Sequence, residues 1–172
     1  MAKTMKVFTL CSFVGFMLSF GKNLSLCISF GTVFYHLAMR LAVGHVYDHA
    51  MQNRANLSSK HWQLRPWEKS LYEKLGVKKW KANMPTYDPE LFSPQKHSWE
   101  EIAQAMCQAE LVHTTIIPLS FLPLLAAIPW GSFGVFLITS LLAACYDAIF
   151  VIMQRYNRPR IMRLLKKENQ RL

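Results

Sequence analysis

The sequence predicts an all-α integral membrane protein, in which two transmembrane helical hairpins, about four spans, are joined by a cytoplasmic interfacial amphipathic segment. Three observations predict this single membrane domain over 1–172. Of the 172 residues, 52% are apolar, and they occur in blocks. The longest block, 111–146, contains no Asp, Glu, Lys or Arg. The 20 Lys and Arg residues outnumber the 10 Asp and Glu residues and lie mainly between the blocks, as in membrane proteins.

The first predicted hairpin covers residues 5–43. Two uncharged stretches, 7–21 and 23–39, are separated by Lys22. A secretory signal peptide is the alternative for the first stretch, with Lys3 and Lys6 as its basic region. No small-residue cleavage site follows, and a second apolar stretch begins at once. We therefore favour a retained hairpin. Whether its helices cross the full bilayer is left open.

The second predicted hairpin covers residues 109–153. As a single helix, the uncharged run 111–146 would measure about 54 Å, whereas the hydrocarbon core of a bilayer is about 30 Å thick. The middle of the run reads Ile-Pro-Trp-Gly-Ser at 128–132. Pro and Gly interrupt helices, and Trp favours the headgroup level. These residues predict a tight turn between spans at 109–128 and 132–153.

The distribution of basic residues predicts the orientation of these spans. The turns of both hairpins are nearly uncharged, whereas ten basic residues lie in 40–110 and seven in 154–172. Basic segments stay on the cytoplasmic side, so both termini and the segment 44–108 are expected in the cytoplasm, with the protein in a bacterial cytoplasmic membrane. This rule already accounts for the net charge of +10, so no nucleic-acid partner is predicted.

The cytoplasmic segment 44–108 contains an amphipathic helix. Its apolar residues recur at three- and four-residue steps: Leu64, Trp67, Leu71 and Leu75. Pro66 suits the first turn of this helix, and Gly76 suits its C-terminal end. The stretch 77–81 follows and reads Val-Lys-Lys-Trp-Lys. We expect it to lie on the anionic inner leaflet, with Trp80 in the interface and Lys79 among lipid phosphates.

Three ionisable residues in the second hairpin are candidate catalytic residues, because such groups are rarely placed in a span without a function. These are Glu110, His113 and Asp147. With the turn at Trp130, His113 and Asp147 lie at similar depth, and Glu110 shares a helix face with His113. The group reads as a general base with its orienting carboxylates. The alternative is a polar clamp that only fixes helix packing, and both remain open.

The stretch 154–160, Gln-Arg-Tyr-Asn-Arg-Pro-Arg, lies at the cytoplasmic end of the last predicted span. Basic anchoring alone does not need Tyr, Asn and Pro between the arginines. The pattern therefore predicts a shaped site in which Arg155, Arg158 and Arg160 bind phosphate groups through their guanidinium forks. Tyr156 and Asn157 would shape this pocket.

Metal binding is not predicted. His45 and His49 are four residues apart and could share a helix face, but no further ligand is evident. The four cysteines have no metal-ligand spacing and are expected to be small apolar side chains. The chain also lacks the His-x4-Asp motif of soluble-type glycerolipid acyltransferases, the Gly-x-Ser-x-Gly motif and the glycine patterns of nucleotide-binding proteins.

Three stretches resemble a known family in their order and content: 67–81, the Ala-Glu-Leu-Val-His block at 109–113, and the arginine-rich heptapeptide at 154–160. Together they resemble the glycosyl-4,4'-diaponeurosporenoate acyltransferase family, small bacterial membrane enzymes of staphyloxanthin synthesis, over about residues 60–165. The heptapeptide is the most specific part. The chain departs from the family pattern at Ala105, Met106 and Gln108, where the family's helix has Glu, Thr and Arg. It also has Asp147 and Ile149 where the family favours Asn and Pro.

The resemblance implies transfer of a fatty acyl group to the sugar hydroxyl of a glycolipid or glycosylated carotenoid at the inner leaflet. Acyl-CoA or a similar acyl donor is the expected co-substrate, and no cofactor is expected. In this hypothesis His113 takes the hydroxyl proton, Glu110 or Asp147 orients the imidazole, and the heptapeptide holds the donor. The competing interpretations are a non-catalytic membrane subunit that retains the family fold and, less favoured, a lipid or small-solute carrier. The acceptor, the acyl chain and the oligomeric state are left open.

Overall fold

The computed structural model describes residues 2–84 and 88–170, and these residues form helices joined by turns, without a β-strand. The predicted all-α class is confirmed. The chain forms two compact units, each made of two separate stretches. Unit 1 comprises Met1–Val46 and Thr114–Asp147, and unit 2 comprises Tyr47–His113 and Ala148–Leu172.

Three helical stretches are long and apolar enough to cross a membrane: Leu24–Met51, Trp99–Trp130 and Phe133–Asn169. They indicate a membrane protein. The first helix, α1 (Ala2–Ser19), has 18 residues and includes Lys3 and Lys6, and it is not among the three. Its apolar part, 7–18, is about 18 Å long at 1.5 Å per residue, which is short for a span. The arrangement of four spans therefore stays a prediction.

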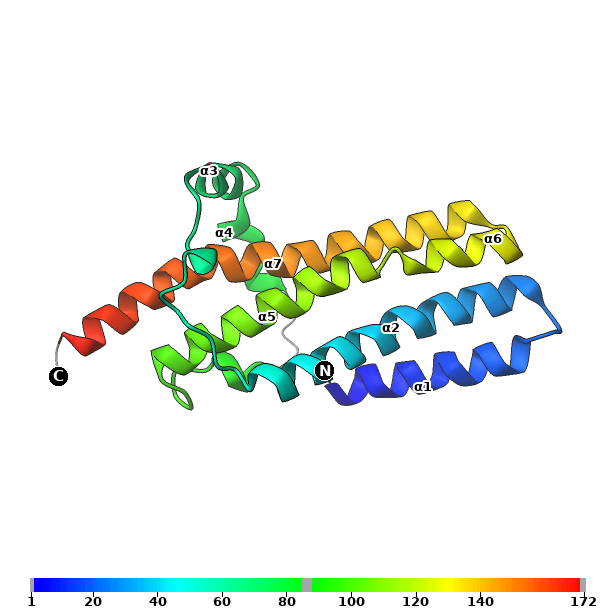
Figure 1. The fold of residues 1–172 in the computed structure, drawn as a ribbon, viewed down its shortest axis with the longest axis horizontal. Coiled ribbons are helices and arrows are strands. Elements are labelled where there is room, and N and C mark those ends of the chain that lie inside the picture. The colour runs from blue at the N-terminus through cyan, green and yellow to red at the C-terminus, as the bar shows by residue number, and fades with distance from the viewer. Residues whose placement is uncertain (1, 85–87, 171–172) are drawn as a thin grey trace. The chain divides into compact units, whose positions relative to one another are not determined.

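In unit 1, α1 and the first part of α2 (Leu24–Met51) lie side by side and antiparallel, as the predicted hairpin requires (Figure 1). The turn between them includes Gly21, whose φ of 72° suits glycine. The ring centroids of Phe13 and Phe34 lie 5.0 Å apart across the pair. Gly15 lies directly against the ring of Phe30, where a Cβ atom would come within 2.7 Å. A small residue at this position thus permits close helix packing.

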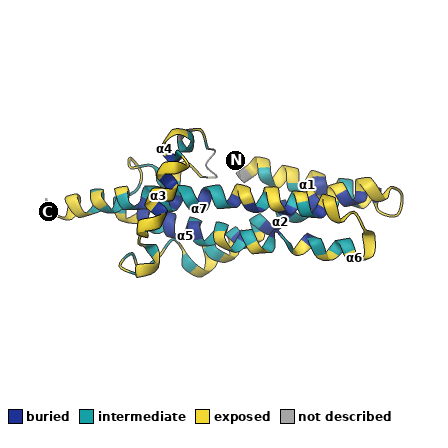
Figure 2. Cartoon of the chain, turned by 90° about the horizontal axis from the view of Figure 1, so that it is seen from above, coloured by how far each residue is buried: buried dark blue, intermediate teal, exposed yellow. Residues whose placement is uncertain are grey.

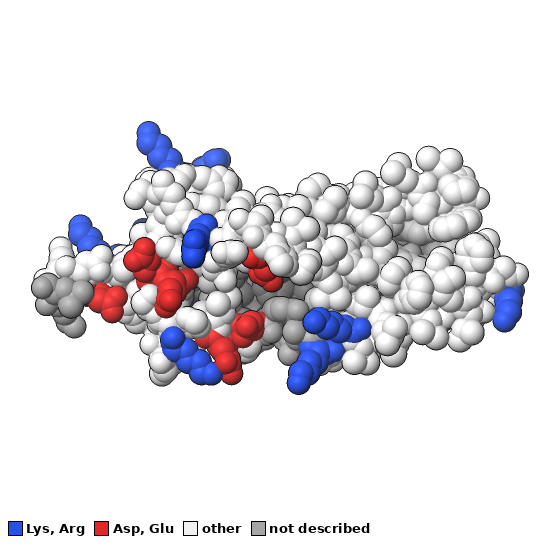
Figure 3. Space-filling model, turned by 60° about the horizontal axis from the view of Figure 1, so that its bottom comes forward, with Lys and Arg blue, Asp and Glu red and all other residues white. Residues whose placement is uncertain are grey.

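Most of the surface of unit 1 is uncharged. Residues 3–18 of α1 are largely exposed although they are mainly apolar (Figure 2). The charged residues of this unit are Lys3, Lys6, Lys22, Arg40 and Asp147. A wide area without acidic or basic side chains is visible in Figure 3. Such a surface suits contact with lipid.

The predicted turn of the second hairpin is confirmed. Gly131 and Ser132 have φ of 69° and 56°, and they separate α6 (Ala127–Trp130) from α7 (Phe133–Asn169). The helix before the turn is interrupted, because α5 (Trp99–Leu119) ends just after Pro118 and is followed by the 3-10 helix η4 (Leu122–Ala126). The end of the predicted cytoplasmic segment 44–108 and the beginning of the predicted span 109–128 form one continuous helix, α5.

Two helices extend past their predicted boundaries. Helix α2 continues to Met51, beyond the predicted end of the first hairpin at 43, and ends before Gln52 and Asn53, which have φ of 51° and 54°. Gly44 lies inside the helix, because a single glycine weakens a helix without ending it, and no proline lies in this stretch. Helix α7 runs through the predicted basic tail to Asn169, with Pro159 inside it.

The predicted helix of the cytoplasmic segment is α3 (Pro66–Lys74), which is followed by Gly76 at φ 61° and the short α4 (Val77–Trp80). The buried residues of α3 are not those of the predicted apolar face but lie beside them on the helix. Glu68 and Tyr72 are 5% and 4% exposed, whereas the predicted apolar face is open: Trp67 58%, Leu71 40% and Leu75 48%. Ion pairing explains the burial of Glu68, because an arginine of α7 binds it.

Candidate functional site

Arg155, a predicted substrate-binding residue, lies at the centre of an ionic network in unit 2. Its Nε and Nη2 atoms donate to Glu68 at 2.6 and 2.9 Å, and its Nη1 atom donates to Glu110 at 2.7 Å. The backbone carbonyls of His61 and Gln63 accept further hydrogen bonds at 3.3 and 3.2 Å. A guanidinium has five N–H donors, so every donor of Arg155 has a partner in the protein.

Arg158, one turn further along α7, is bound to the same carboxylate. It is 2% exposed, and its Nη2 atom donates to the second oxygen of Glu110 and to the carbonyl of Met106. Its Nη1 atom donates to the carbonyl of Trp62 in η1 (Lys60–Trp62), and its guanidinium lies 5.0 Å from the Trp62 ring centroid. Glu110 therefore links two guanidiniums with its two oxygens, as carboxylates and Arg forks do when buried.

The network joins α3, α5 and α7 and carries two negative and two positive charges. Burial alone would raise the pKa of Glu68, but the hydrogen bonds from Arg155 and from the backbone N–H of Arg65 lower the pKa below its usual value. The carboxylate form of Glu68 is thus favoured. A phosphate group could bind Arg155 only by displacing one of these carboxylates, and Arg158 is out of reach of solvent.

His113, the predicted general base, lies on α5 three residues after Glu110. Its imidazole is half-buried and stacks on Phe150 of α7, with centroids 4.7 Å apart and an angle of 12° between the rings. This stacking fixes the plane of the imidazole. Glu110 and His113 therefore occupy one face of α5, as predicted, although the oxygens of Glu110 are bound by arginines.

Asp147, the other predicted carboxylate, belongs to unit 1, where it is fully buried and paired with Arg40 of α2. Arg40 also donates to the carbonyl of Ala143 at 3.3 Å. One turn before Arg40 lies buried His36, whose two ring nitrogens have no hydrogen-bond partner among the described residues. Because His113 belongs to unit 2, the predicted convergence of Asp147 with His113 stays a prediction.

Two of the remaining predicted binding residues, Tyr156 and Asn157, contact Lys81 of η2 (Lys81–Asn83). Its ammonium donates to Oδ1 of Asn157 and lies 4.7 Å from the ring centroid of Tyr156. Arg160 is exposed, and so is Lys79. The predicted interfacial Trp80 is half-buried, and its indole N–H donates to the carbonyl of Leu75 at 3.1 Å. Tyr156 and Asn157 thus do gather at one place, around a lysine that the sequence analysis did not single out.

Gln108, one of the departures from the family pattern, has a structural role. Its amide donates to Asp48 at 2.7 Å, and its carbonyl oxygen accepts from the backbone N–H of Asn53 at 2.7 Å. An arginine at this position could not accept the second hydrogen bond. Ala105, another departure, is buried at 1% exposure, so the site has no space for a larger side chain without a shift of its neighbours.

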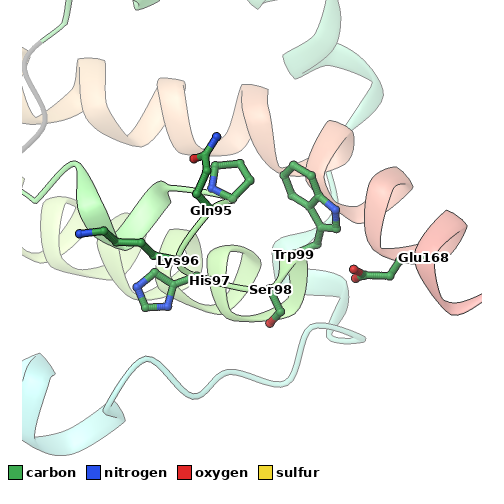
Figure 4. Close-up of a pocket in the computed structure, with 7 residues that line it drawn as sticks. Gln95, Lys96, His97, Ser98, Trp99 and Glu168 are labelled. Atoms are coloured by element: carbon green, nitrogen blue, oxygen red, sulfur yellow. The ribbon is translucent and has the colours of Figure 1, made fainter.

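An open cavity of about 350 Å³ lies beside the first turn of α5, in unit 2 (Figure 4). It is lined by 94–99 and by Glu168 of α7. Ser98 and Glu101 cap the helix here: the hydroxyl of Ser98 accepts from the N–H of Glu101 at 3.2 Å, and the carboxylate of Glu101 accepts from the N–H of Ser98 at 2.8 Å. The cavity was not predicted and contains none of the predicted site residues.

Sequence reasoning missed Glu68, Arg40 and Lys81. Glu68 carried a signal, because it is the third residue of a helix that begins with Pro66 and its carboxylate accepts from the helix-capping N–H of Arg65 at 2.7 Å. Arg40 is flanked by long uncharged stretches but was counted only among the loop charges. Among the described residues no group of three or more His, Cys, Asp or Glu could hold a metal ion, and this includes His45 and His49.

A sequence model of the family described as glycosyl-4,4'-diaponeurosporenoate acyltransferase matches residues 53–167. The match covers the ionic network, His113 and the heptapeptide 154–160. No curated protein and no solved structure matches the chain significantly.

Proposed function

The chain belongs to the glycosyl-4,4'-diaponeurosporenoate acyltransferase family, and on that premise we propose that it is a membrane-embedded O-acyltransferase. It moves a fatty acyl group from an activated donor, such as acyl-CoA, to a sugar hydroxyl of a glycolipid or glycosylated carotenoid. The observation that carries the proposal is that the family match, over residues 53–167, includes His113 and the residue that its imidazole stacks on, Phe150. The reaction takes place at the inner leaflet of a bacterial cytoplasmic membrane, with both termini in the cytoplasm.

His113 acts as the general base. Its imidazole takes the proton of the acceptor hydroxyl, and the oxygen attacks the carbonyl carbon of the acyl thioester. The C–O ester bond forms, the C–S bond breaks, and the imidazolium returns its proton to the leaving thiolate. No net oxidation occurs. The half-buried position of His113 and the stacking of its ring on Phe150 support this role, because they fix the ring while leaving part of it accessible.

The carboxylates and arginines of the network are positioning residues in this proposal. Glu110 ties α5 to Arg155 and Arg158 of α7 one turn from His113, so the base sits on a helix that cannot rotate freely. The exposed apolar face of α3, with Trp67, Leu71 and Leu75, supports a location at the membrane surface. Acceptor lipids would then reach the base from the bilayer.

One observation favours a second candidate, a non-catalytic membrane subunit that retains the family fold. Arg155 has a protein partner for each donor and Arg158 is buried, so both guanidiniums are held within the protein as in a purely structural clamp. In this alternative, His113 packs on Phe150 without a role in chemistry. A variant of His113 that keeps the packing distinguishes the two functions.

The test is lipid mass spectrometry of cells that carry the wild-type gene, a deletion, or His113→Phe. Phenylalanine keeps an aromatic ring against Phe150 but has no proton acceptor. His97→Ala is the control, because His97 is a histidine of the same unit whose imidazole lies 3.6 Å from the exposed carboxylate of Glu101. We expect an acylated glycolipid to disappear in the deletion and in His113→Phe but to persist in His97→Ala. If no lipid changes in the deletion, the enzyme function is refuted. If the lipid persists in His113→Phe, His113 is not the base.

A further inference from the structure

Three positive side chains in unit 2 gather without an acidic partner. Lys81 of η2 is half-buried and binds Asn157 of α7; Arg160 lies three residues after Asn157 in the same helix, and Lys78 lies three residues before Lys81. None of the three forms an ion pair with a carboxylate in the part of the chain that the structure describes. Burial and the two neighbouring cations lower the pKa of Lys81 below its usual value. An anion bound between these cations would relieve their repulsion.

The ammonium of Lys81 is held in place by uncharged groups. It donates one hydrogen bond to Oδ1 of Asn157, and the ring centroid of Tyr156 lies 4.7 Å away. Tyr156 is in turn packed edge-on against Tyr72 of α3, with ring centroids 6.5 Å apart. An ammonium has three donors, so two have no partner among the described residues and can serve a ligand. The side chain is thus oriented before any ligand arrives.

Lys81 and Arg160 have N–H donors without a partner among the described residues, and this distinguishes them from Arg155 and Arg158. Arg155 has used its five donors within the protein, and Arg158 is 2% exposed. Arg160 is exposed and forms no hydrogen bond with the described residues. Phosphate oxygens take N–H donors from flexible ammonium and guanidinium groups that are not already neutralised.

We propose that Lys81, Arg160 and Lys78 form a phosphate-binding site at the contact between the segment 77–83 and α7, with Asn157 and Tyr156 holding Lys81. The ligand is a phosphate or diphosphate group on a larger molecule. The identity of this ligand rests on the proposed function: for an acyltransferase that uses acyl-CoA, the ligand is the phosphate portion of acyl-CoA. The same chemistry is offered by the headgroup of an anionic lipid, and the experiment distinguishes the two sources.

The test measures binding of CoA by calorimetry to the full-length protein in phosphatidylcholine nanodiscs. We expect Lys81→Gln and Arg160→Gln each to weaken binding about tenfold, the effect of losing one charge-assisted contact, and Lys81→Arg to retain most of it. Lys74→Gln is the control, because Lys74 is an exposed lysine on α3, and its binding should stay within about twofold of wild type. Arg160 is exposed, so Arg160→Gln tests the site without disturbing the packed lysine.

A second arm identifies the source of the phosphate. Nanodiscs with phosphatidylglycerol are compared with phosphatidylcholine alone: if the lipid headgroup occupies the site, CoA does not bind in either disc, and Lys81→Gln lowers the phosphatidylglycerol that copurifies. In the acyl-transfer assay, Lys81→Gln should raise KM for acyl-CoA but leave kcat and the KM for acyl-pantetheine, which lacks phosphate, unchanged.

Failure of this site and failure of the proposed function give different results. If the protein binds CoA through Lys81 but transfers no acyl group, the enzyme function is refuted and the site is retained. If acyl transfer occurs while Lys81→Gln and Arg160→Gln bind CoA and phosphatidylglycerol as the wild type does, the site is refuted and the function is retained.

Discussion

Replacement of Glu110 by glutamine tests the ionic network most directly. Glu110 is buried and accepts from both Arg155 and Arg158, so Glu110→Gln leaves the buried guanidinium of Arg158 without a counter-charge. Breaking a buried ion pair from one side costs about 3–5 kcal/mol. For a chain of this length, about 2–4 °C of Tm corresponds to 1 kcal/mol, so we expect Tm to fall by about 6–20 °C.

The assay is thermal unfolding of the purified protein in detergent, followed by near-ultraviolet circular dichroism. Arg158→Met should cost less than Glu110→Gln, because Glu110 then still has Arg155 as its partner. The double variant Glu110→Gln/Arg158→Met should recover part of the loss, since no guanidinium is left buried and unpaired. Glu73→Gln, at an exposed carboxylate on α3, is the matched control. A Tm for Glu110→Gln equal to that of Glu73→Gln would refute the argument from burial.

Two further predictions concern pH and helix packing. The pKa of Glu68 is lower in the folded protein than in the unfolded chain, so its pairing with Arg155 stabilises the fold at pH values above the usual carboxyl pKa, and this stability is lost as the pH falls through the folded pKa. In acid titrations followed by circular dichroism, Glu68→Gln should make this loss of stability less steep. An unchanged slope would contradict the assignment. Gly15→Ala should lower Tm, because a Cβ atom would meet the ring of Phe30 at 2.7 Å. Gly44→Ala, with open space around it, should raise Tm, because alanine stabilises a helix by up to about 1 kcal/mol relative to glycine. Equal effects of the two variants would show that the hairpin is not packed as described.

Local signals in the sequence predicted the helix ends well. Helix α3 begins at Pro66, because a proline lacks only an N–H that the first turn of a helix does not need. It ends before Gly76, because a glycine readily takes positive φ. The turn at Gly131 was predicted for the same reason. The end of α2 was not, because Gly44 weakens a helix without ending it, and the helix ends instead at Gln52 and Asn53, of which only Asn53 is a residue that favours positive φ.

The orientation of α3 could not be predicted from its own residues. Hydrophobic periodicity assumes that the apolar face is the buried one, and this holds when a helix packs on an apolar core in water. At a membrane surface the apolar face can instead face lipid, and the buried face is chosen by ion pairing. Glu68 is buried because Arg155, 87 residues later, binds it, and no local pattern contains that information.

The partners of Arg155 are separated widely along the chain. Glu68 and Glu110 precede it by 87 and 45 residues, and the carbonyl of His61 by 94. Translation therefore delivers both acids long before their guanidinium. Until the ribosome has released the last helix, neither carboxylate has its native counter-ion, and the segment 44–108 lacks the ion pairs that tie it to α7. Maturation of this region is thus expected to be a post-insertion event, completed only when the final helix is in place.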